Sequence, residues 1–141
     1  MVLKKPRFGR FANIETLRMQ RLCIKALPAW TNKTPGQVID HFIASKPIVV
    51  FSKTRCKYCK LAKAALDTFK LSPRQFEKVE LDKLKDVDYR KIQDEFEVRY
   101  GTRTVPKVFI GGKFIGGGTD TIKMQKNGTL AVLVKKAIKS A

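Results

Sequence analysis

The chain of 141 residues is predicted to fold as an α/β protein with a small, mixed, four-stranded β-sheet flanked by helices. Three observations predict this class. The run "PIVVFS" at residues 47–52 is short and apolar, which is typical of a strand covered on both faces. The run "KVFIGGKFIGG" at residues 107–117 contains two β-prone segments joined by Gly111 and Gly112, which predicts an antiparallel hairpin. The remaining segments alternate between helical and extended patterns, in the order α, β, α, β, α, β, β, α.

The first helix is predicted over residues 34–45, "TPGQVIDHFIAS". Thr34 is a favourable N-cap. Pro35 suits the first helical position because an N–H at that position would have no partner within the helix, so its absence costs nothing. Val38, Phe42 and Ile43 are spaced to form the buried face of this helix.

A second helix is predicted from Cys56 to about Phe69, followed by a strand over residues 76–82, "FEKVELD". Because a helix joins this strand to the first one, the two strands are expected to be parallel. The apolar stripe of the helix is expected to consist of Leu61, Ala64, Ala65, Leu66 and Phe69.

The third helix is predicted within "VDYRKIQDEFEVRYG", residues 87–101, and Gly101 suits the left-handed position that ends a helix. One or two helices are predicted from residue 119 to the end of the sequence. The last of them carries an apolar face of Leu130, Leu133, Val134 and Ile138.

The charge is strongly basic, with 30 Lys and Arg against 12 Asp and Glu and a formal net charge of +18. Such a field attracts anions of many kinds and does not select one partner. Three cysteines cannot all pair with one another, which favours a reducing intracellular compartment, the cytoplasm or the mitochondrial matrix, over secretion. No run approaches the roughly 18 to 20 apolar residues that cross a bilayer, so no membrane span is expected.

Residues 1–33 are predicted to be a basic N-terminal extension, ahead of a single domain at residues 34–141. Arg18, Arg21 and Lys25 share one face of a possible amphipathic helix, which suits a matrix-targeting presequence, although the segment has no serine. A solvated basic arm explains the same pattern. A module that binds nucleic acid or a membrane surface through this basic segment is a third class of function, which would depend on charge alone; nucleic acid is not an expected partner.

Cys56 and Cys59 form a C-x-x-C pair whose chemistry can be narrowed by elimination. A structural zinc ion needs four ligands, and the only other candidates are Cys23 and His41. A permanent structural disulfide across two residues would constrain little of the unfolded chain. Thiol–disulfide exchange is the remaining chemistry.

The position of Cys56 favours this chemistry, because it falls where a strand ends and a helix begins. The free N–H groups and the positive end of the helix dipole stabilise a thiolate there, and Lys53, Arg55 and Lys57 add positive charge. Cys56 is therefore predicted to be the nucleophile. Cys59, one turn deeper, is predicted to resolve the mixed disulfide.

The segment "RTVP" precedes the strand of the hairpin, and the residue before a proline favours extended backbone. A cis bond between Val105 and Pro106 would present the main chain of Val105 beside the thiol. The sequence alone does not fix that isomer.

The motifs "KTRCKYC", "RTVP" and "FIGGKFIGGGTD", in this order and spacing, resemble those of a dithiol glutaredoxin with the thioredoxin-like fold, over about residues 36–140. The resemblance implies a mostly monomeric, glutathione-dependent oxidoreductase that acts on protein disulfides and on proteins carrying glutathione. It also implies a glutathione groove. The carboxylate of the glycine end would meet Lys53, Gln93 and Arg103, and the cysteinyl part would pair with Val105. The other residues expected there are Tyr58, Thr104, Pro106, Thr119 and Asp120, with Asp120 meeting the γ-glutamyl ammonium.

The sequence departs from the commonest family pattern at two positions. Lys57 stands where proline is usual, and Gly118 stands where several relatives carry a further cysteine. Some family members without that proline hold a [2Fe–2S] cluster between two protomers, through the first cysteine of each and two glutathiones. A cluster-binding dimer with Cys56 as the metal ligand is therefore the alternative function. Lys60 and Lys63 are expected to be solvated.

Overall fold

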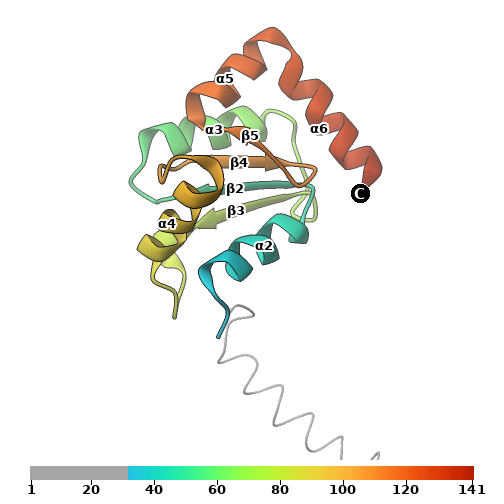
Figure 1. Ribbon diagram of the computed structural model, residues 1–141. Helices are drawn as coiled ribbons and strands as arrows, with labels where there is room; N and C mark the ends of the chain where they lie inside the picture. The colour runs from blue at the N-terminus through green and yellow to red at the C-terminus, as the bar shows by residue number, and fades with distance from the viewer. Residues whose placement is uncertain (1–31) are drawn as a thin grey trace, which may run out of the picture. The chain divides into compact units, whose positions relative to one another are not determined.

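The computed structural model describes residues 32–141, and residues 33–141 form one compact unit (Figure 1). The predicted amphipathic helix of the extension, with Arg18, Arg21, Cys23 and Lys25, lies outside the described residues. The boundary proposed at residue 33 therefore stays a prediction. Within residues 32–141, no helix has the length and apolar character that a bilayer span requires.

The described strands form one mixed sheet. They are β2 (Ile48–Ser52), β3 (Phe76–Glu80), β4 (Lys107–Ile110) and β5 (Lys113–Gly116), in the spatial order β3-β2-β4-β5. Strand β2 is parallel to β3 and antiparallel to β4, and β4 is antiparallel to β5. The predicted sheet is confirmed.

The second strand was predicted to end at residue 82, and this end was wrong. Strand β3 ends at Glu80, and Leu81–Lys83 form a short 3-10 helix, η1. The alternation of apolar residues already slips in this segment, because the buried residues Phe76 and Val79 are three positions apart. Leu81 is still fully buried, but it reaches the core from η1.

Five of the helices within residues 32–141 cover the two faces of the sheet (Figure 1). Helices α2 (Pro35–Ser45) and α4 (Tyr89–Tyr100) lie on one face, and α3 (Lys57–Asp67), α5 (Gly118–Asn127) and α6 (Thr129–Ser140) lie on the other. The core beneath α3, α5 and α6 is mainly aliphatic, with Ile48, Val50 and Leu66 among its members. The opposite face is aromatic and is built around Phe51, whose ring meets three other phenylalanine rings edge to face.

The predicted caps are present at two helices. Thr34 accepts from the N–H of Gln37 at 3.2 Å and donates its own N–H to the Gln37 side chain at 2.9 Å. Gly101 ends α4 with φ of 86°, a left-handed conformation that favours glycine. The predicted helix ends were therefore correct where a local capping signal was present.

Two predicted buried faces were partly wrong. In α2, Ile39 is fully buried where Ile43 was expected, and Ile43 is only half-buried. In α3, Leu61 and Ala64 are exposed, and the buried residues are Cys59, Ala62, Ala65 and Leu66. The face of α3 that packs on the sheet is thus rotated by about one residue from the expected stripe. By contrast, the apolar face of α6 packs against the core as expected.

Lys63 is not the solvated residue that its sequence context predicts. Its Nζ lies 2.5 Å from Oε1 of Glu80 on β3, and the two side chains are 17% and 20% exposed. The other carboxylate oxygen of Glu80 is buried without a hydrogen-bond partner among the described residues. Lys63 therefore compensates a largely buried negative charge, whereas Lys60 is exposed as expected.

Replacing Lys63 with methionine should lower the free energy of unfolding by about 2 kcal/mol, because a largely buried carboxylate loses its counter-charge. Urea denaturation at pH 7 measures this value. Lys60→Met, a matched change on the exposed side of α3, should alter it by less than about 0.5 kcal/mol. Equal losses in the two variants would contradict a structural role for the Lys63–Glu80 ion pair.

Candidate active site

The two cysteines lie where β2 passes into α3. They form a disulfide with Cα atoms 5.1 Å apart. Cys56 is the N-cap of α3, one residue ahead of the first helical position, and its sulfur accepts from the N–H of Cys59 at 3.2 Å. Cys56 is half-buried and Cys59 is completely buried. Only the first sulfur is therefore accessible to a visiting molecule.

The electrostatic setting of Cys56 follows from this capping position. Its sulfur faces the free N–H groups at the positive end of the helix, which stabilise negative charge on sulfur. Lys53, Arg55 and Lys57 flank it in sequence. None of the three belongs to an ion pair within residues 32–141, and Lys53 Nζ lies 4.4 Å from the centre of the Tyr89 ring.

The loop that leads to Cys56 is held by Asp82 of η1, a residue that the sequence analysis missed. The carboxylate accepts from the N–H of Thr54 at 3.2 Å and from its hydroxyl at 2.5 Å. The hydroxyl bond is the main reason why the pKa of Asp82 lies below its ordinary value. Asp82 thus fixes a segment only two residues ahead of the nucleophile.

The loop before β4 provides the opposite wall of the site. The Val105–Pro106 peptide bond is cis, the isomer that the sequence could suggest but not fix. The carbonyl oxygen of Val105 lies 3.8 Å from the sulfur of Cys56, and Pro106 is buried. The main chain of Val105 is therefore adjacent to the accessible sulfur.

A hollow of about 520 Å³ adjoins this loop. Its walls come from the first turn of α3, the segment from Tyr100 to Lys107, strand β5 and the start of α5. Six of the residues expected at a glutathione groove line it: Tyr58, Thr104, Val105, Pro106, Thr119 and Asp120.

The three residues expected to meet a carboxylate are not part of this lining. Gln93 is largely buried and donates its amide to the carbonyl of Arg103 at 2.9 Å. The Arg103 guanidinium is 2.5 Å from Asp94. Gln93 and Arg103 are thus neighbours, but each already has a partner within the protein, and Lys53 is stacked on Tyr89.

The start of α5 approaches the first turn of α3 closely. The carboxylate of Asp120 accepts from the N–H of Gly117 at 3.1 Å, which fixes it at the N-terminus of α5. A Cβ placed on Gly118 would lie 2.9 Å from Cβ of Tyr58 and 3.0 Å from the Tyr58 carbonyl oxygen. Glycine is therefore required at position 118 for this packing, and a cysteine there would displace the helix that carries the thiol.

Replacing Gly118 with alanine should lower the free energy of unfolding by about 1 to 3 kcal/mol, because the clashing atoms belong to or adjoin the backbone and cannot rotate away. Thermal and urea denaturation measure the loss. Gly36→Ala is a matched control, since the added Cβ there meets no backbone atom and only the ends of two side chains, Arg99 and Glu95. A stable Gly118→Ala protein with unchanged activity would show that α3 and α5 are not so tightly packed.

The sequence analysis did not identify Lys107 as part of the site, although a lysine in the otherwise apolar run "KVFI" could have indicated a buried cation. Its side chain is 2% exposed, and its ammonium donates to the Thr102 hydroxyl at 2.8 Å and to the Thr104 carbonyl at 2.9 Å. The rings of Phe96 and Phe114 lie 5.5 Å and 5.4 Å from it. Burial lowers the pKa of Lys107. This residue ties β4 to the segment that presents Val105.

This combination of a mixed four-stranded sheet and a C-x-x-C pair on the helix after its central parallel strand defines a thioredoxin-like dithiol protein. Solved structures agree. Oxidised glutaredoxin 2 from Chlamydomonas reinhardtii matches with a TM-score of 0.64 and 39% identity, over 74% of this chain and 96% of that one. The buckwheat glutaredoxin–glutathione complex matches with a TM-score of 0.66 and 35% identity, over 73% of this chain and 89% of that one. The chain belongs to the glutaredoxin family, whose sequence model matches residues 48–115.

Among sequence relatives, mouse mitochondrial glutaredoxin-2 is 39% identical over 102 residues, which are 72% of this chain and 62% of the relative. The chain thus spans about three fifths of the length of that relative.

Proposed function

We propose that this glutaredoxin is a glutathione-dependent oxidoreductase that reduces protein disulfides and protein–glutathione mixed disulfides through Cys56 and Cys59. The observation that carries the proposal is the unequal exposure of the two sulfurs: Cys56 is accessible beside the Val105 carbonyl, and Cys59 is buried behind it. An external disulfide can reach only the first sulfur.

The proposed reaction begins with attack of the Cys56 thiolate on a substrate disulfide. One substrate sulfur leaves as a thiolate, and the other is bonded to Cys56. If the bound group is glutathione, a second glutathione thiolate attacks it, which releases glutathione disulfide and regenerates the Cys56 thiolate. If the bound group is a protein, Cys59 attacks the Cys56 sulfur and releases the reduced protein. Two glutathiones then reduce the Cys56–Cys59 disulfide and leave as glutathione disulfide.

The hollow of about 520 Å³ is the proposed glutathione groove. Val105 would pair its main chain with the cysteinyl part, and Asp120 would bind the γ-glutamyl ammonium, with Tyr58, Thr104, Pro106 and Thr119 as further lining. Glutathione is bound by the buckwheat relative, which supports this ligand. Lys53, Gln93 and Arg103 are proposed to hold the glycine carboxylate; for Arg103 this requires release from Asp94.

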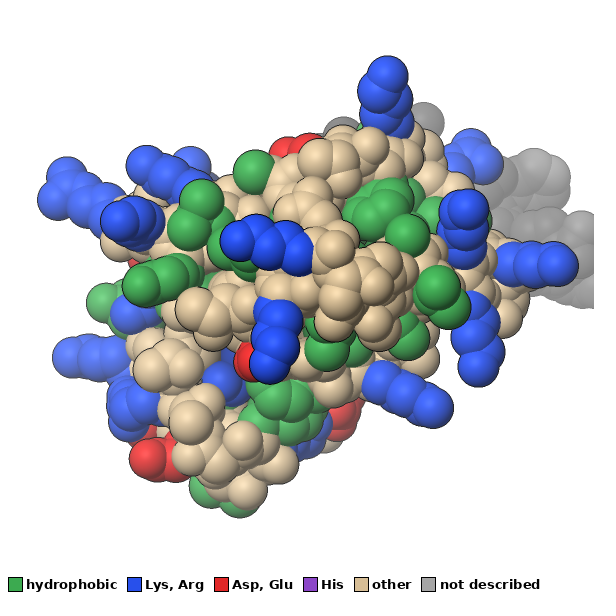
Figure 2. All heavy atoms as spheres, turned by 90° about the horizontal axis from the view of Figure 1, so that it is seen from above, with side chains coloured by type: hydrophobic (Ala, Val, Ile, Leu, Met, Phe, Trp, Pro, Cys, Tyr) green, Lys and Arg blue, Asp and Glu red, His purple; other side chains and the backbone are tan. Residues whose placement is uncertain are grey.

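The charge distribution supports an anionic cosubstrate. Figure 2 shows a face with many lysine and arginine side chains and few acidic ones. Helices α5 and α6 carry one acidic residue, Asp120, against the following lysines: Lys123, Lys126, Lys135, Lys136 and Lys139. Glutathione has a net negative charge near neutral pH, so this field should raise its association rate.

The test is a coupled assay on the full chain with a glutathionylated peptide, glutathione, glutathione reductase and NADPH. We expect a rate of NADPH oxidation that requires the protein, saturates as the peptide concentration is raised, and falls as salt is added. If fully reduced protein gave a rate no higher than that of the reaction without protein, the proposal would be refuted. The same assay without glutathione is the control.

A glutathione-ligated [2Fe–2S] dimer is the second candidate. The described residues contain no group of three or more His, Cys, Asp or Glu placed to hold a metal, so further ligands would come from glutathione and a second protomer. Lys57 and Tyr58 are exposed beside Cys56, which leaves that face open to a second copy. An absorption spectrum and a size-exclusion profile of protein purified anaerobically with glutathione distinguish the two. A brown dimer supports the cluster, and a colourless, active monomer supports the oxidoreductase alone.

A further inference from the structure

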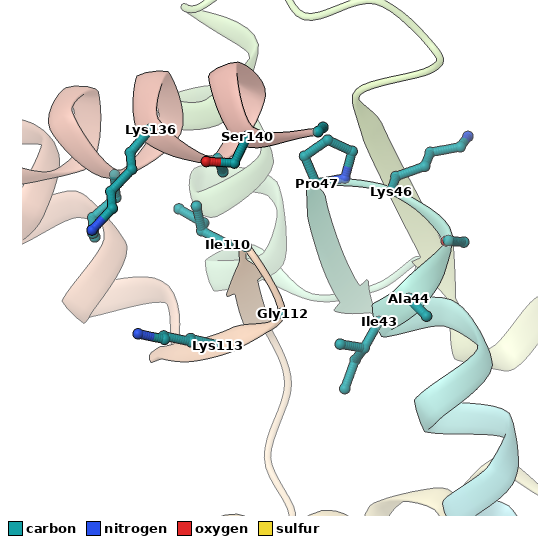
Figure 3. A pocket seen from close by; sticks show the side chains of 14 residues that line it. Ile43, Ala44, Lys46, Pro47, Ile110, Gly112, Lys113, Lys136 and Ser140 are labelled. Atoms are coloured by element: carbon teal, nitrogen blue, oxygen red, sulfur yellow. The ribbon is translucent and has the colours of Figure 1, made fainter.

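Figure 3 shows a second hollow, of about 550 Å³. It lies at the end of β2 where the strand begins, whereas the cysteines follow the end of the strand. Its lining comes from three segments that are distant in sequence: residues 43–47 at the end of α2, residues 110–113 at the β4–β5 turn, and α6. Strand β2 begins directly after Pro47 and ends at Ser52, so the strand separates this hollow from the dithiol. A ligand here would not compete with glutathione.

The chemistry of the lining is divided between an apolar surface and a cationic rim. The apolar part consists of Ile43, Pro47, Ile110, Leu133 and Ala137. Figure 3 shows Lys113 and Lys136 extending from β5 and α6 in the same direction, whereas Lys46 extends the other way. Lys46 is neutralised by Glu77 at 2.5 Å.

The two remaining cations are available for a ligand. Lys113 and Lys136 are exposed, and neither takes part in an ion pair within residues 32–141. No acidic side chain lines the hollow. An anion placed at this rim would therefore meet two ammonium groups and no carboxylate side chain. The last residue, Ala141, also lines the hollow, so its terminal carboxylate is the negative group that these two cations must outweigh.

We propose that this hollow binds a small amphiphilic carboxylate of the medium-chain fatty-acid class. The alkyl chain would lie against Ile43, Ile110 and Leu133, and the carboxylate would meet Lys113 and Lys136. The volume falls within the range of roughly 300–1,000 Å³ that is usual for small-molecule sites. An apolar surface with a few placed polar groups is also the usual composition of such sites.

The test is a titration of the isotopically labelled full chain with decanoate, followed by two-dimensional NMR. Saturable shifts are expected at the amides of Gly111, Gly112 and Lys113. The double variant Lys113→Gln/Lys136→Gln should weaken binding about tenfold or more, because both cations are lost. Lys123→Gln/Lys126→Gln, with the same change of charge on α5, should bind decanoate as the original chain does.

Two further binding measurements test the role of the carboxylate and the location of the site separately. Decanol, which has the alkyl chain without the charge, should bind about tenfold more weakly or worse. Ala44→Trp places a bulky ring at an exposed lining position and should abolish binding while the fold is retained. Equal affinity for decanol and decanoate, equal weakening by the two double variants, or shifts centred on Cys56 and Val105 would each overturn the proposal. None of these outcomes depends on oxidoreductase activity.

Discussion

Cys56→Ser is expected to reduce glutathione-dependent activity to the uncatalysed background, on glutathionylated peptides and on protein disulfides alike. Serine can still cap α3, so the fold should persist, but a hydroxyl cannot form the mixed disulfide. The coupled assay measures the loss, and circular dichroism confirms that the protein is folded. Residual activity above background in Cys56→Ser would mean that another thiol can act as the nucleophile.

Cys59→Ser should separate the two reactions. Reduction of glutathionylated peptides should continue, because free glutathione attacks the glutathione bound to Cys56. Turnover of a protein disulfide should fall about tenfold or more, since an intramolecular thiol acts at a much higher effective concentration than a free one. Equal losses on both substrates would contradict this division of roles between Cys56 and Cys59.

Lys107→Met should raise the KM for a glutathionylated peptide about tenfold while kcat changes little. Methionine fills a similar volume but cannot donate to Thr102 and Thr104, so the segment that presents Val105 loses its support. Because Lys107 holds the proposed binding segment and does not touch the sulfurs in the described contacts, the effect should lie mainly in binding. Lys113→Met, at an exposed position on the neighbouring strand, is the control for the loss of one charge.

Lys107 should also change how the free energy of unfolding depends on pH. Burial lowers the pKa of Lys107 in the folded protein below the ordinary value of about 10.5. Between the pKa of the folded state and that of the unfolded state, the unfolded chain therefore binds more protons than the folded one. The free energy of unfolding should therefore rise with pH in that interval. Urea denaturation of the original chain and of Lys107→Met, from pH 7.5 to 10.5, measures the difference. Identical slopes would show that the buried ammonium is not penalised.

Features determined by neighbouring residues were predictable from the sequence. The Thr34 cap, the end of α4 at Gly101 and the hairpin at Gly111 each depend on a few adjacent positions, and all are present. The capping position of Cys56 was predicted to within one residue because a strand signal precedes it and a helical pattern follows.

Features that depend on distant partners were not predictable in this way. Lys63 looked solvated because its partner, Glu80, lies on a strand that helical periodicity cannot reveal. The burial of Lys107 depends on rings contributed by α4 and β5. Asp82 was missed for the same reason: its bond to Thr54 spans 28 positions in sequence.

The Asp82–Thr54 contact has a consequence for the equilibrium between dithiol and disulfide. Only residues 53–55 separate the central strand from Cys56, and Thr54 is held in the middle of that connection. A short, anchored connection restricts the positions that the Cys56 sulfur can take and so raises the frequency with which it meets Cys59. Releasing Thr54 would lower that frequency, favour the open dithiol and make the reduction potential of the pair less negative. We therefore expect the oxidising strength of this protein to depend partly on a carboxylate that lies on a different element from the two sulfurs.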